Sequence, residues 1–307
     1  MRYVEHKDIC KNKWDELIIS VSHTQFCFLF DFLTSICKWD AIILEEQGKY
    51  VMVLPVPFKK KLWVKYFYQP FFVQQLGVIS STKVTQKHQL SVVSLLKRRF
   101  NFGQMNWNMK FDIHTQDIHF ITKTNYVLPL ELSYEEQLKK LNKNRQRIIK
   151  KLGREDFVTK VCYENQDFEE VILRFAKLFE IKIPEVTQFH YRTVINALNK
   201  IYDQLEIIAV KVQRGGLTAS GSLFINMNGR LVYLLGYTED EFKSQSVHIL
   251  SFTRIMELFN TSEVVLDLEG GEDAGIGGFY RSLGADKEHY YQVRLKPRNF
   301  LFRKIFR

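Results

Sequence analysis

Cysteine and proline are scarce in this sequence, and long apolar runs are missing. The 307 residues include 4 cysteines and 6 prolines. The cysteines show neither CxxC nor Cys/His ligand spacing, which argues against a zinc site and favours a reducing compartment. The longest apolar run, residues 26–37, contains an aspartate and is far shorter than the roughly 20 residues that a membrane span requires. No transmembrane helix is therefore predicted.

Several chemical motifs are missing as well. The first residues, MRYVEHKDICKNKWDE, lack the apolar core of a signal peptide, so export is not expected and a cytoplasmic protein is predicted. No P-loop and no Ser/His/Asp triad occurs, and the eight histidines are dispersed. We therefore expect no metal site and no certain cofactor.

Apolar side chains and positive charge are plentiful. The length of 307 residues suits one large domain or two ordinary ones, and the 46% apolar and 14% aromatic residues are enough to form their hydrophobic cores. The net charge of +10 favours an anionic partner, although such a charge can also serve solubility alone.

Strand-like patterns dominate the first third. The runs 41–45 and 50–55 predict a hairpin that turns near Gly48. Residues 62–68 are expected to pair with 50–58 through a solvated turn at Lys59–Lys61. A helix is predicted over 90–100, and strands over 102–108, 118–122 and 126–130.

A second pattern begins at Ser133, where Ser133 and Glu136 form a predicted helix capping box. Asn228-Gly229 predicts a tight hairpin turn. The predicted domains are 1–130 and 131–307, and the last residues could pack back on the first domain. Each domain is expected to repeat the same order of elements: helices, an antiparallel meander, a helix and late strands. The expected helices are 134–152, 167–180, 188–202, 246–259 and 275–283, and the expected strands are 157–163, 205–212, 217–226, 230–237, 263–268 and 288–295.

A helical wheel over 134–152 places Arg145 in the apolar stripe that holds Leu141 and Ile148, whereas Arg147 lies on the wet side. A guanidinium that faces inward needs a partner. That partner is a core-edge acid such as Asp267 or Glu269, a carbonyl cluster, or an anionic ligand at a cleft.

Three segments, in order, resemble FemAB-like members of the GNAT acyltransferase superfamily. They are the hairpin and Gln-Leu-Gly stretch YVMVLPVPFKKKLWVKYFYQPFFVQQLGV, the strand and basic helix VLPLELSYEEQLKKL with KNRQRIIKK, and the glycine-bent strand end LDLEGGEDAGIGGFYRSLGA. The likeness spans most of the chain. Gln146, Ile149 and Leu283 depart from the family pattern, which leaves the substrate open.

The resemblance implies an α/β fold of two tandem GNAT-like domains, with mixed, mostly antiparallel sheets flanked by helices. It also implies transfer of an acyl or aminoacyl group to an amine. A CoA-dependent member would carry a glycine-rich pyrophosphate loop, because backbone N–H groups and a helix N-terminus bind phosphate. The matching segment, Gly236–Leu250, instead carries Glu239, Asp240 and Glu241. FemAB-like proteins also lack that loop, which implies an aminoacyl-tRNA donor, while acyl-CoA stays open.

Acyl transfer to an amine needs a base for the nitrogen and donors for the oxyanion. Glu269 and Asp267 at the predicted strand end are the first catalytic candidates, followed by His248 and Tyr237. Three of these four candidates have a structural alternative: Asp267 as a turn cap, Tyr237 as a hairpin aromatic and His248 as a packed core histidine.

The substrate-binding candidates share polarity or an exposed backbone near the expected cleft. Gly270 and Gly271 could bind an anion through N–H groups or could serve the turn alone. The predicted binding residues are Arg145, Tyr68, Gln74, Gln75, Gly270, Gly271 and Arg281.

These observations predict an N-acyltransferase whose acceptor is an anionic small molecule or a cell-envelope precursor, with tRNA a possible partner. One alternative is a non-catalytic basic GNAT-fold protein that binds RNA or another polyanion. Another is a CoA-dependent N-acetyltransferase.

Overall fold

The computed structural model describes residues 1–113, 116–180, 183 and 185–296. The basic tail 298–307, predicted to pack on one of the domains, lies outside the described residues. Contacts divide the chain into two compact units: residues 1–123 with those from 289 on, and Thr124–Glu288. These units divide within two long strands, a few residues from the domain boundary predicted after residue 130.

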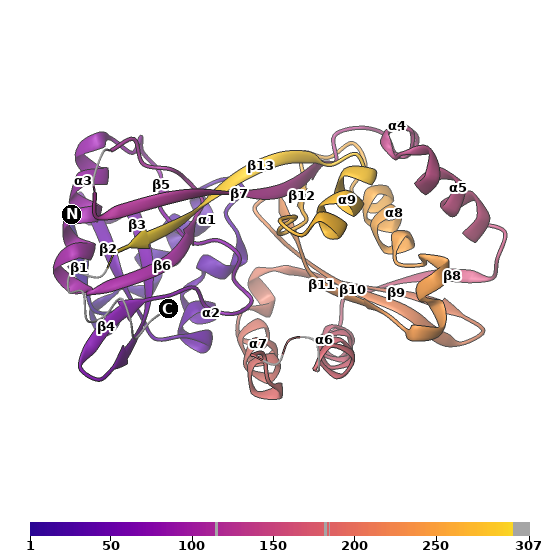
Figure 1. Cartoon of the computed structure of the whole chain (residues 1–307), viewed down its shortest axis with the longest axis horizontal. Helices are drawn as coiled ribbons and strands as arrows, with labels where there is room; N and C mark the ends of the chain where they lie inside the picture. Colours follow the sequence, from indigo (N-terminus) through magenta and orange to yellow (C-terminus); the bar gives the residue numbers. More distant parts are fainter. Residues whose placement is uncertain (114–115, 181–182, 184, 297–307) are drawn as a thin grey trace. The chain divides into compact units, whose positions relative to one another are not determined.

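The first unit contains short helices and a meander of strands (Figure 1). Its helical elements are η1 (His6–Asp8), α1 (Lys11–Ser20), η2 (Phe26–Phe28), α2 (Phe30–Ile36) and α3 (Gln86–Arg99). Its strands are β1 (Arg2–Val4), β2 (Trp39–Glu46), β3 (Lys49–Lys61), β4 (Val64–Phe67), β5 (Ile79–Ser80), β6 (Phe102–Trp107) and parts of β7 (Ile118–Pro129) and β13 (Asp286–Leu295).

The second unit contains the remaining elements (Figure 1). Its helical elements are α4 (Tyr134–Lys140), α5 (Lys143–Leu152), α6 (Asn165–Phe179), α7 (Gln188–Lys200), η3 (Tyr202–Gln204), η4 (Asp240–Gln245), α8 (Ile249–Leu258) and α9 (Ala274–Ser282). Its strands are β8 (Phe157–Cys162), β9 (Glu206–Arg214), β10 (Leu217–Met227), β11 (Arg230–Thr238) and β12 (Val265–Asp267), with the other parts of β7 and β13.

Both units follow the same strand plan. In the first, the meander β2-β3-β4 is antiparallel, and β6 joins β4 in parallel after the crossover helix α3. In the second, the meander β9-β10-β11 is antiparallel, and β12 joins β11 in parallel after α8. A parallel pair needs such a crossover, because a tight turn can only reverse the chain. The predicted fold of two tandem GNAT-like units is confirmed.

The sheet of the second unit is covered on both faces. Helices α6 and α7 lie on one side of β9 to β11, and α8 and α9 lie on the other (Figure 1). The fully buried side chains Phe224, Phe252 and Leu266 belong to the core beneath α8. Burial of this kind stabilises by roughly 25 cal/mol per Å² of apolar surface.

The single helix predicted over 134–152 is wrong, because the chain forms two helices there. Leu141 is extended, and Asn142 caps α5 by accepting the Arg145 backbone N–H at 2.8 Å. Gln146 donates to the Leu141 carbonyl at 2.7 Å, which satisfies an acceptor at the break. Arg145 therefore lies in the first turn of α5, and the wheel that spanned both helices does not apply.

Two strand predictions need correction. The residues 118–122 and 126–130 belong to one strand, β7, which continues through Asn125 instead of turning there. The turn predicted at Lys59–Lys61 lies further on, at Leu62-Trp63, since β3 pairs with β4 as far as Lys61 opposite Val64. The hairpins at Gly48 and at Asn228-Gly229 are confirmed, and their turn residues have positive φ.

The cap at Asn142 gives a first prediction. Asn142→Ala removes the side-chain acceptor and should lower the free energy of unfolding by about 1 kcal/mol. Urea denaturation measures this change. Asn144→Ala, which alters an exposed residue of the same helix, should stay within about 0.5 kcal/mol of the parent. Equal losses in both variants would contradict the cap.

Candidate functional site

The end of β12 is an abrupt, glycine-bent turn. Its backbone is left-handed at three successive residues, with φ of 45° at Glu269, 114° at Gly270 and 124° at Gly271. Gly271 must be glycine for a second reason, because an added Cβ would lie 2.4 Å from the Tyr126 ring. A glutamate in this conformation is strained, and such strain clusters at functional sites.

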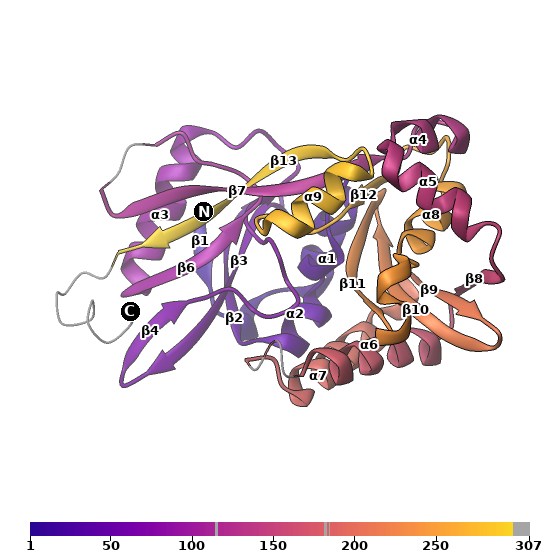
Figure 2. The same ribbon diagram turned by 45° about the vertical axis from the view of Figure 1, so that its right-hand side comes forward.

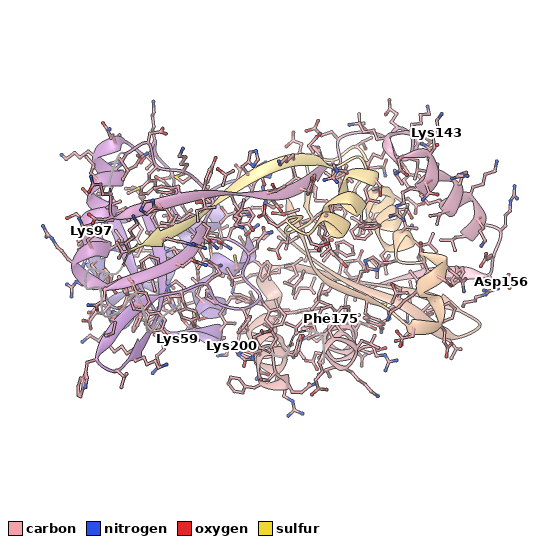
Figure 3. The ribbon with its side chains drawn as sticks, viewed as in Figure 1. Lys59, Lys97, Lys143, Asp156, Phe175 and Lys200 are labelled. Carbon is pink, nitrogen blue, oxygen red and sulfur yellow. The ribbon has the colours of Figure 1, made fainter. Side chains whose placement is uncertain are left out.

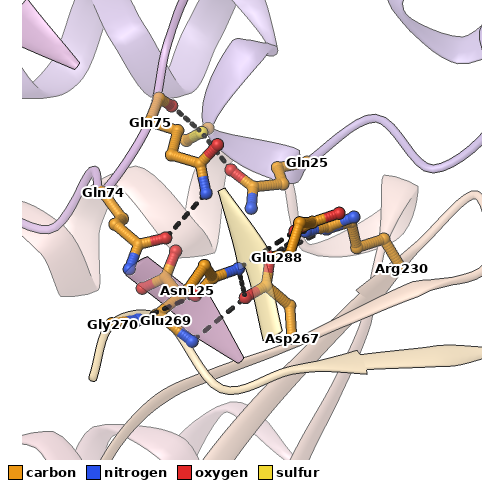
Figure 4. Close-up of polar contacts among 10 residues, drawn as sticks. Gln25, Gln74, Gln75, Asn125, Arg230, Asp267, Glu269, Gly270 and Glu288 are labelled. Carbon is orange, nitrogen blue, oxygen red and sulfur yellow. Dashed lines mark hydrogen bonds and ion pairs between the residues drawn. The ribbon is translucent and has the colours of Figure 1, made fainter. Parts of the chain in front are cut away.

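Asp267 anchors this turn through a buried ion pair that the sequence analysis missed. Its carboxylate is fully buried, and the Arg230 guanidinium contacts it at 2.6 Å. Arg230 also pairs with Glu288 at 2.6 Å. Burial would lower the pKa of Arg230, but the two carboxylates outweigh burial and raise that pKa above its usual range. Figure 4 shows these contacts.

Asn125 joins the ion pair to the turn. Its amide nitrogen donates to Asp267 at 2.9 Å and to Glu288 at 3.2 Å, and its amide oxygen accepts the Gly270 N–H at 2.8 Å. The Glu269 N–H donates to Asp267 at 3.0 Å. Both peptide groups of the turn are thus tied to one network (Figure 4). We call Asn125, Arg230, Asp267, Glu269 and Glu288 the strand-end cluster.

Glu269 is the one carboxylate of the strand-end cluster that has no hydrogen bond or ion pair among the described residues. Burial, followed by repulsion from Asp267, raises the pKa of Glu269 well above the usual glutamate range, and Arg230 opposes this only partly. A raised pKa makes a carboxylate a better proton acceptor, which is the property that a general base needs. Asp267, in contrast, accepts hydrogen bonds from the turn, which is the turn-capping role that the sequence analysis gave as its structural alternative.

Helix α9 places two further side chains beside the turn. Burial, then Glu269 and Asp267, raises the pKa of Tyr280, which keeps its hydroxyl neutral. Arg281 donates to the Tyr126 hydroxyl at 2.6 Å, and that ring packs on Gly271. Among the described residues no carboxylate pairs with Arg281, so its positive charge is available to a ligand.

The two glycines offer fewer anion donors than predicted. The Gly270 N–H is bound to Asn125, and only the Gly271 N–H has no acceptor among the described residues. The N-terminus of α9 is capped by Asp273, which accepts from Gly275 and Ile276 at 2.9 Å each. The conformational role of the glycines is therefore established by the backbone, and anion binding stays a prediction.

Arg145 lies at the other end of α9 from Glu269. Its Nε donates to Ser282 at 2.9 Å, and its guanidinium lies 4.8 Å from the centre of the Phe279 ring. No carboxylate among the described residues pairs with it, so the alternative of an ion pair with Asp267 or Glu269 is not what forms. Because α9 spans nine residues, or about 13 Å, the structure does not bring Arg145 and Glu269 together.

Tyr237 lines a different hollow of the second unit. Arg174 pairs there with both oxygens of Glu239. The cavity measures about 500 Å³ and is also bordered by Asp240 and Glu241. Burial, then Glu239, raises the pKa of Tyr237 to about 12, so the hydroxyl stays protonated. The exclusion of a pyrophosphate from this segment stays a prediction.

His248 stands directly before the first residue of α8, and both of its ring nitrogens take part in a chain of hydrogen bonds. Ser220 donates to the Tyr237 carbonyl at 2.7 Å, so its oxygen accepts from His248 Nδ1 at 3.0 Å. His248 Nε2 then accepts from Tyr233 at 2.8 Å. Burial lowers the pKa of His248 to about 4, and the neutral ring has no unused nitrogen. The packed-histidine alternative describes this geometry.

The three candidates of the first unit lie in and beside an irregular segment after β4. Gln75 donates to Gln74 at 2.8 Å, and Gln75 is buried. Tyr68 has Lys59 over its ring at 4.3 Å, and burial raises its pKa to about 12. The two glutamines meet, whereas Tyr68 packs against the β3–β4 hairpin.

Sequence reasoning missed Arg230, Asn125 and Glu288 because each lies far along the chain from Asp267. One signal was present for Arg230. It follows the Asn228-Gly229 turn at the first position of a strand, where a charged side chain on a buried sheet requires an acid nearby.

The fold and the turn together define the class: the chain has a FemAB-like GNAT fold. No protein-family model and no curated protein matches the sequence. Among solved structures, FemX is similar at 13% identity, with 95% of this chain and 97% of that chain covered and a TM-score of 0.66.

Two further structures share the fold over nearly their whole length. L-PGS from Bacillus licheniformis has 10% identity, coverage of 96% of this chain and 95% of that chain, and a TM-score of 0.57. A conserved protein of unknown function from Bacteroides thetaiotaomicron has 10% identity, coverage of 94% and 98%, and a TM-score of 0.62. No described helix is long and apolar enough to cross a membrane.

The buried histidine gives a second prediction. Its pKa is about 4 in the folded chain and 6.5 when unfolded, so the unfolded state binds more protons between these values. The stability that the neutral His248 ring contributes should therefore be present in full above pH 6.5. The free energy of unfolding should fall by as much as about 3 kcal/mol as the pH drops to 4. Urea unfolding across this range measures the loss.

His248→Gln should show a smaller fall over the same range, because the proton-linked group is gone. His119→Gln, which changes an exposed histidine, should behave as the parent does. An equal pH dependence in the parent and in His248→Gln would contradict the prediction.

Proposed function

We propose that this protein is an N-acyltransferase that moves an acyl or aminoacyl group onto an amine. The FemAB-like GNAT fold supports this class of reaction, although fold alone does not decide function. The observation that carries the proposal is Glu269, an unpaired carboxyl group with a raised pKa on a strained turn.

Glu269 would serve as the base. The amine nitrogen attacks the carbonyl carbon of the donor ester or thioester, and the bond from that carbon to the carrier oxygen or sulfur breaks. The nitrogen loses one proton to Glu269, and that proton is passed on to the leaving oxygen or sulfur. A base whose pKa lies near the working pH contributes about 10²–10⁴-fold to such a step.

Arg281 and the Gly271 N–H would bind negative charge beside this base. Arg281 is a fixed cation with no acid partner among the described residues, and its hydrogen bond to Tyr126 holds it near the turn. A donor amide and a guanidinium can stabilise the oxyanion of a tetrahedral intermediate or hold a phosphate or carboxylate of a substrate.

The donor that we propose is an aminoacyl-tRNA, as the family resemblance implies. The acidic residues around the Tyr237 hollow disfavour the pyrophosphate of CoA. A cytoplasmic location and an acceptor among anionic or cell-envelope precursor amines remain part of the proposal. The CoA-dependent acetyltransferase and the non-catalytic RNA-binding protein are the alternatives that the assays below separate.

Glu269→Gln gives the third prediction. The amide cannot accept the proton, so kcat should fall by about 10²–10⁴-fold while the thermal midpoint stays unchanged or rises. Transfer is measured by mass spectrometry with mixed aminoacyl-tRNAs, and in parallel with acetyl-CoA, on a panel of peptide and precursor amines. The parent should lose kcat/KM as the pH falls toward the raised pKa of Glu269, and the variant should not.

Glu263→Gln is the matched control, because it changes an exposed carboxyl group just before β12 and should retain full activity. Transfer from acetyl-CoA alone would favour the acetyltransferase alternative. No turnover with either donor, together with RNA binding that weakens steeply with salt, would contradict the proposal and favour the binding protein.

Arg145 gives the fourth prediction. Its guanidinium is partly buried without a neutralising acid, and burial lowers its pKa from the usual arginine value. If it holds an acceptor phosphate or carboxylate, Arg145→Ala should raise the KM for the acceptor about tenfold with little change in kcat. Arg147→Ala, on the exposed side of α5, should leave KM unchanged. An unchanged KM in the folded Arg145 variant would contradict this role.

A further inference from the structure

The tip of the β3–β4 hairpin departs from the chemistry of every other two-residue hairpin turn among the described residues. Those turns are Gln47-Gly48, Gly215-Gly216 and Asn228-Gly229, and all contain glycine. The β3–β4 turn is Leu62-Trp63, with φ of 47° and 68°. Both residues adopt the left-handed conformation that Asn-Gly would accept more readily. Hairpin stability therefore does not explain this pair.

Both side chains are also exposed to solvent. Leu62 is 75% exposed and Trp63 is 102% exposed, although the other three tryptophans are buried. The hairpin extends past its neighbouring strands in the first unit (Figure 2). Two large apolar groups are thus held away from the body of the unit, and none of the unit's described residues covers them.

The hairpin carries positive charge behind this tip. The end of β3 contributes Lys59, Lys60 and Lys61, and Lys59 is labelled in Figure 3. No aspartate or glutamate occurs between Glu46 and Asp112, a stretch with eleven lysine and arginine residues. These three lysines lie within three residues of Leu62, so an anionic surface that received Trp63 would contact them as well.

We infer that this hairpin is a docking element for an anionic lipid surface. Tryptophan favours the level of the lipid headgroups, and lysines near such a surface are attracted by anionic lipids. Binding strength then comes from the small apolar insertion and the charge together. The inference does not depend on the proposed transferase activity.

Two other occupants fit the tip less well. A stable protein interface buries about 1,200–2,000 Å², which a two-residue tip cannot supply. A single-stranded nucleic acid would stack on an aromatic ring, but it would gain nothing from the neighbouring leucine. A bilayer accepts both side chains and needs no matching shape.

Trp63 makes the test direct, because it is the single exposed tryptophan of the chain. Vesicles of phosphatidylglycerol mixed with phosphatidylcholine should shift the tryptophan emission to the blue and protect it from acrylamide. Acyl-chain-brominated lipids should quench it. Pure phosphatidylcholine vesicles should have much weaker effects, and added salt should reverse the binding. No blue shift and no quenching with the anionic vesicles at low salt would overturn the inference.

Leu62→Asn/Trp63→Gly removes the apolar tip and fits the turn better, so loss of folding does not confuse the result. Its partition onto anionic vesicles in a sedimentation assay should be at least about tenfold weaker. Lys59→Gln and Lys60→Gln should each weaken binding about fivefold and lower the salt dependence. Phe189→Ser, at an exposed aromatic residue of the second unit, should bind as the parent does.

Equal binding by the parent and the Leu62→Asn/Trp63→Gly variant would overturn the inference. So would quenching of Trp63 by an RNA oligonucleotide with no response to vesicles, which would identify a nucleic-acid surface. Acyl transfer measured on soluble amines should be the same in the hairpin variants as in the parent, which separates this inference from the proposed function.

Discussion

The buried ion pair between Arg230 and Asp267 is the constraint on which the candidate site depends. Asp267 has no solvent exposure, and it ends β12 beside the strand that begins at Arg230. Loss of either partner would leave an uncompensated charge in the sheet, which typically costs about 3–5 kcal/mol. The pair therefore fixes where β12 stops. Everything in the turn that follows is positioned from that point.

The same network explains how a strained turn persists. The two oxygens of Asp267 are shared among Arg230, Asn125 and the Glu269 N–H, and Asn125 holds the Gly270 N–H. These bonds use the backbone of Glu269 and leave its carboxylate unbound. Asp267 and Glu269 are close in sequence, yet one is a structural anion and the other a titratable group. Their pairing, not their residue type, separates the two roles.

Local patterns predicted most elements, because their causes are local. The Ser133 capping box and the Asn228-Gly229 turn each act within a few residues, and both are present. The break at Leu141 was missed because apolar spacing continues across it, while the cause is the Asn142 cap. Arg230 was missed for a different reason. Its partner lies 37 residues away, and only the parallel pairing of β11 with β12 brings them together.

Some residues other than glycine adopt a left-handed backbone conformation that their side chains disfavour. The chain places glycine or asparagine in several tight turns, so it can satisfy such a conformation at little cost. Glu269 and the Leu62-Trp63 pair adopt it with side chains that gain nothing from the turn itself. Each also has a second unusual property. The pKa of the Glu269 carboxyl group is raised, and the side chains of the Leu62-Trp63 pair are exposed to solvent. Where a strained backbone and an unused chemical group coincide, the turn itself does not account for the side chain that occupies it.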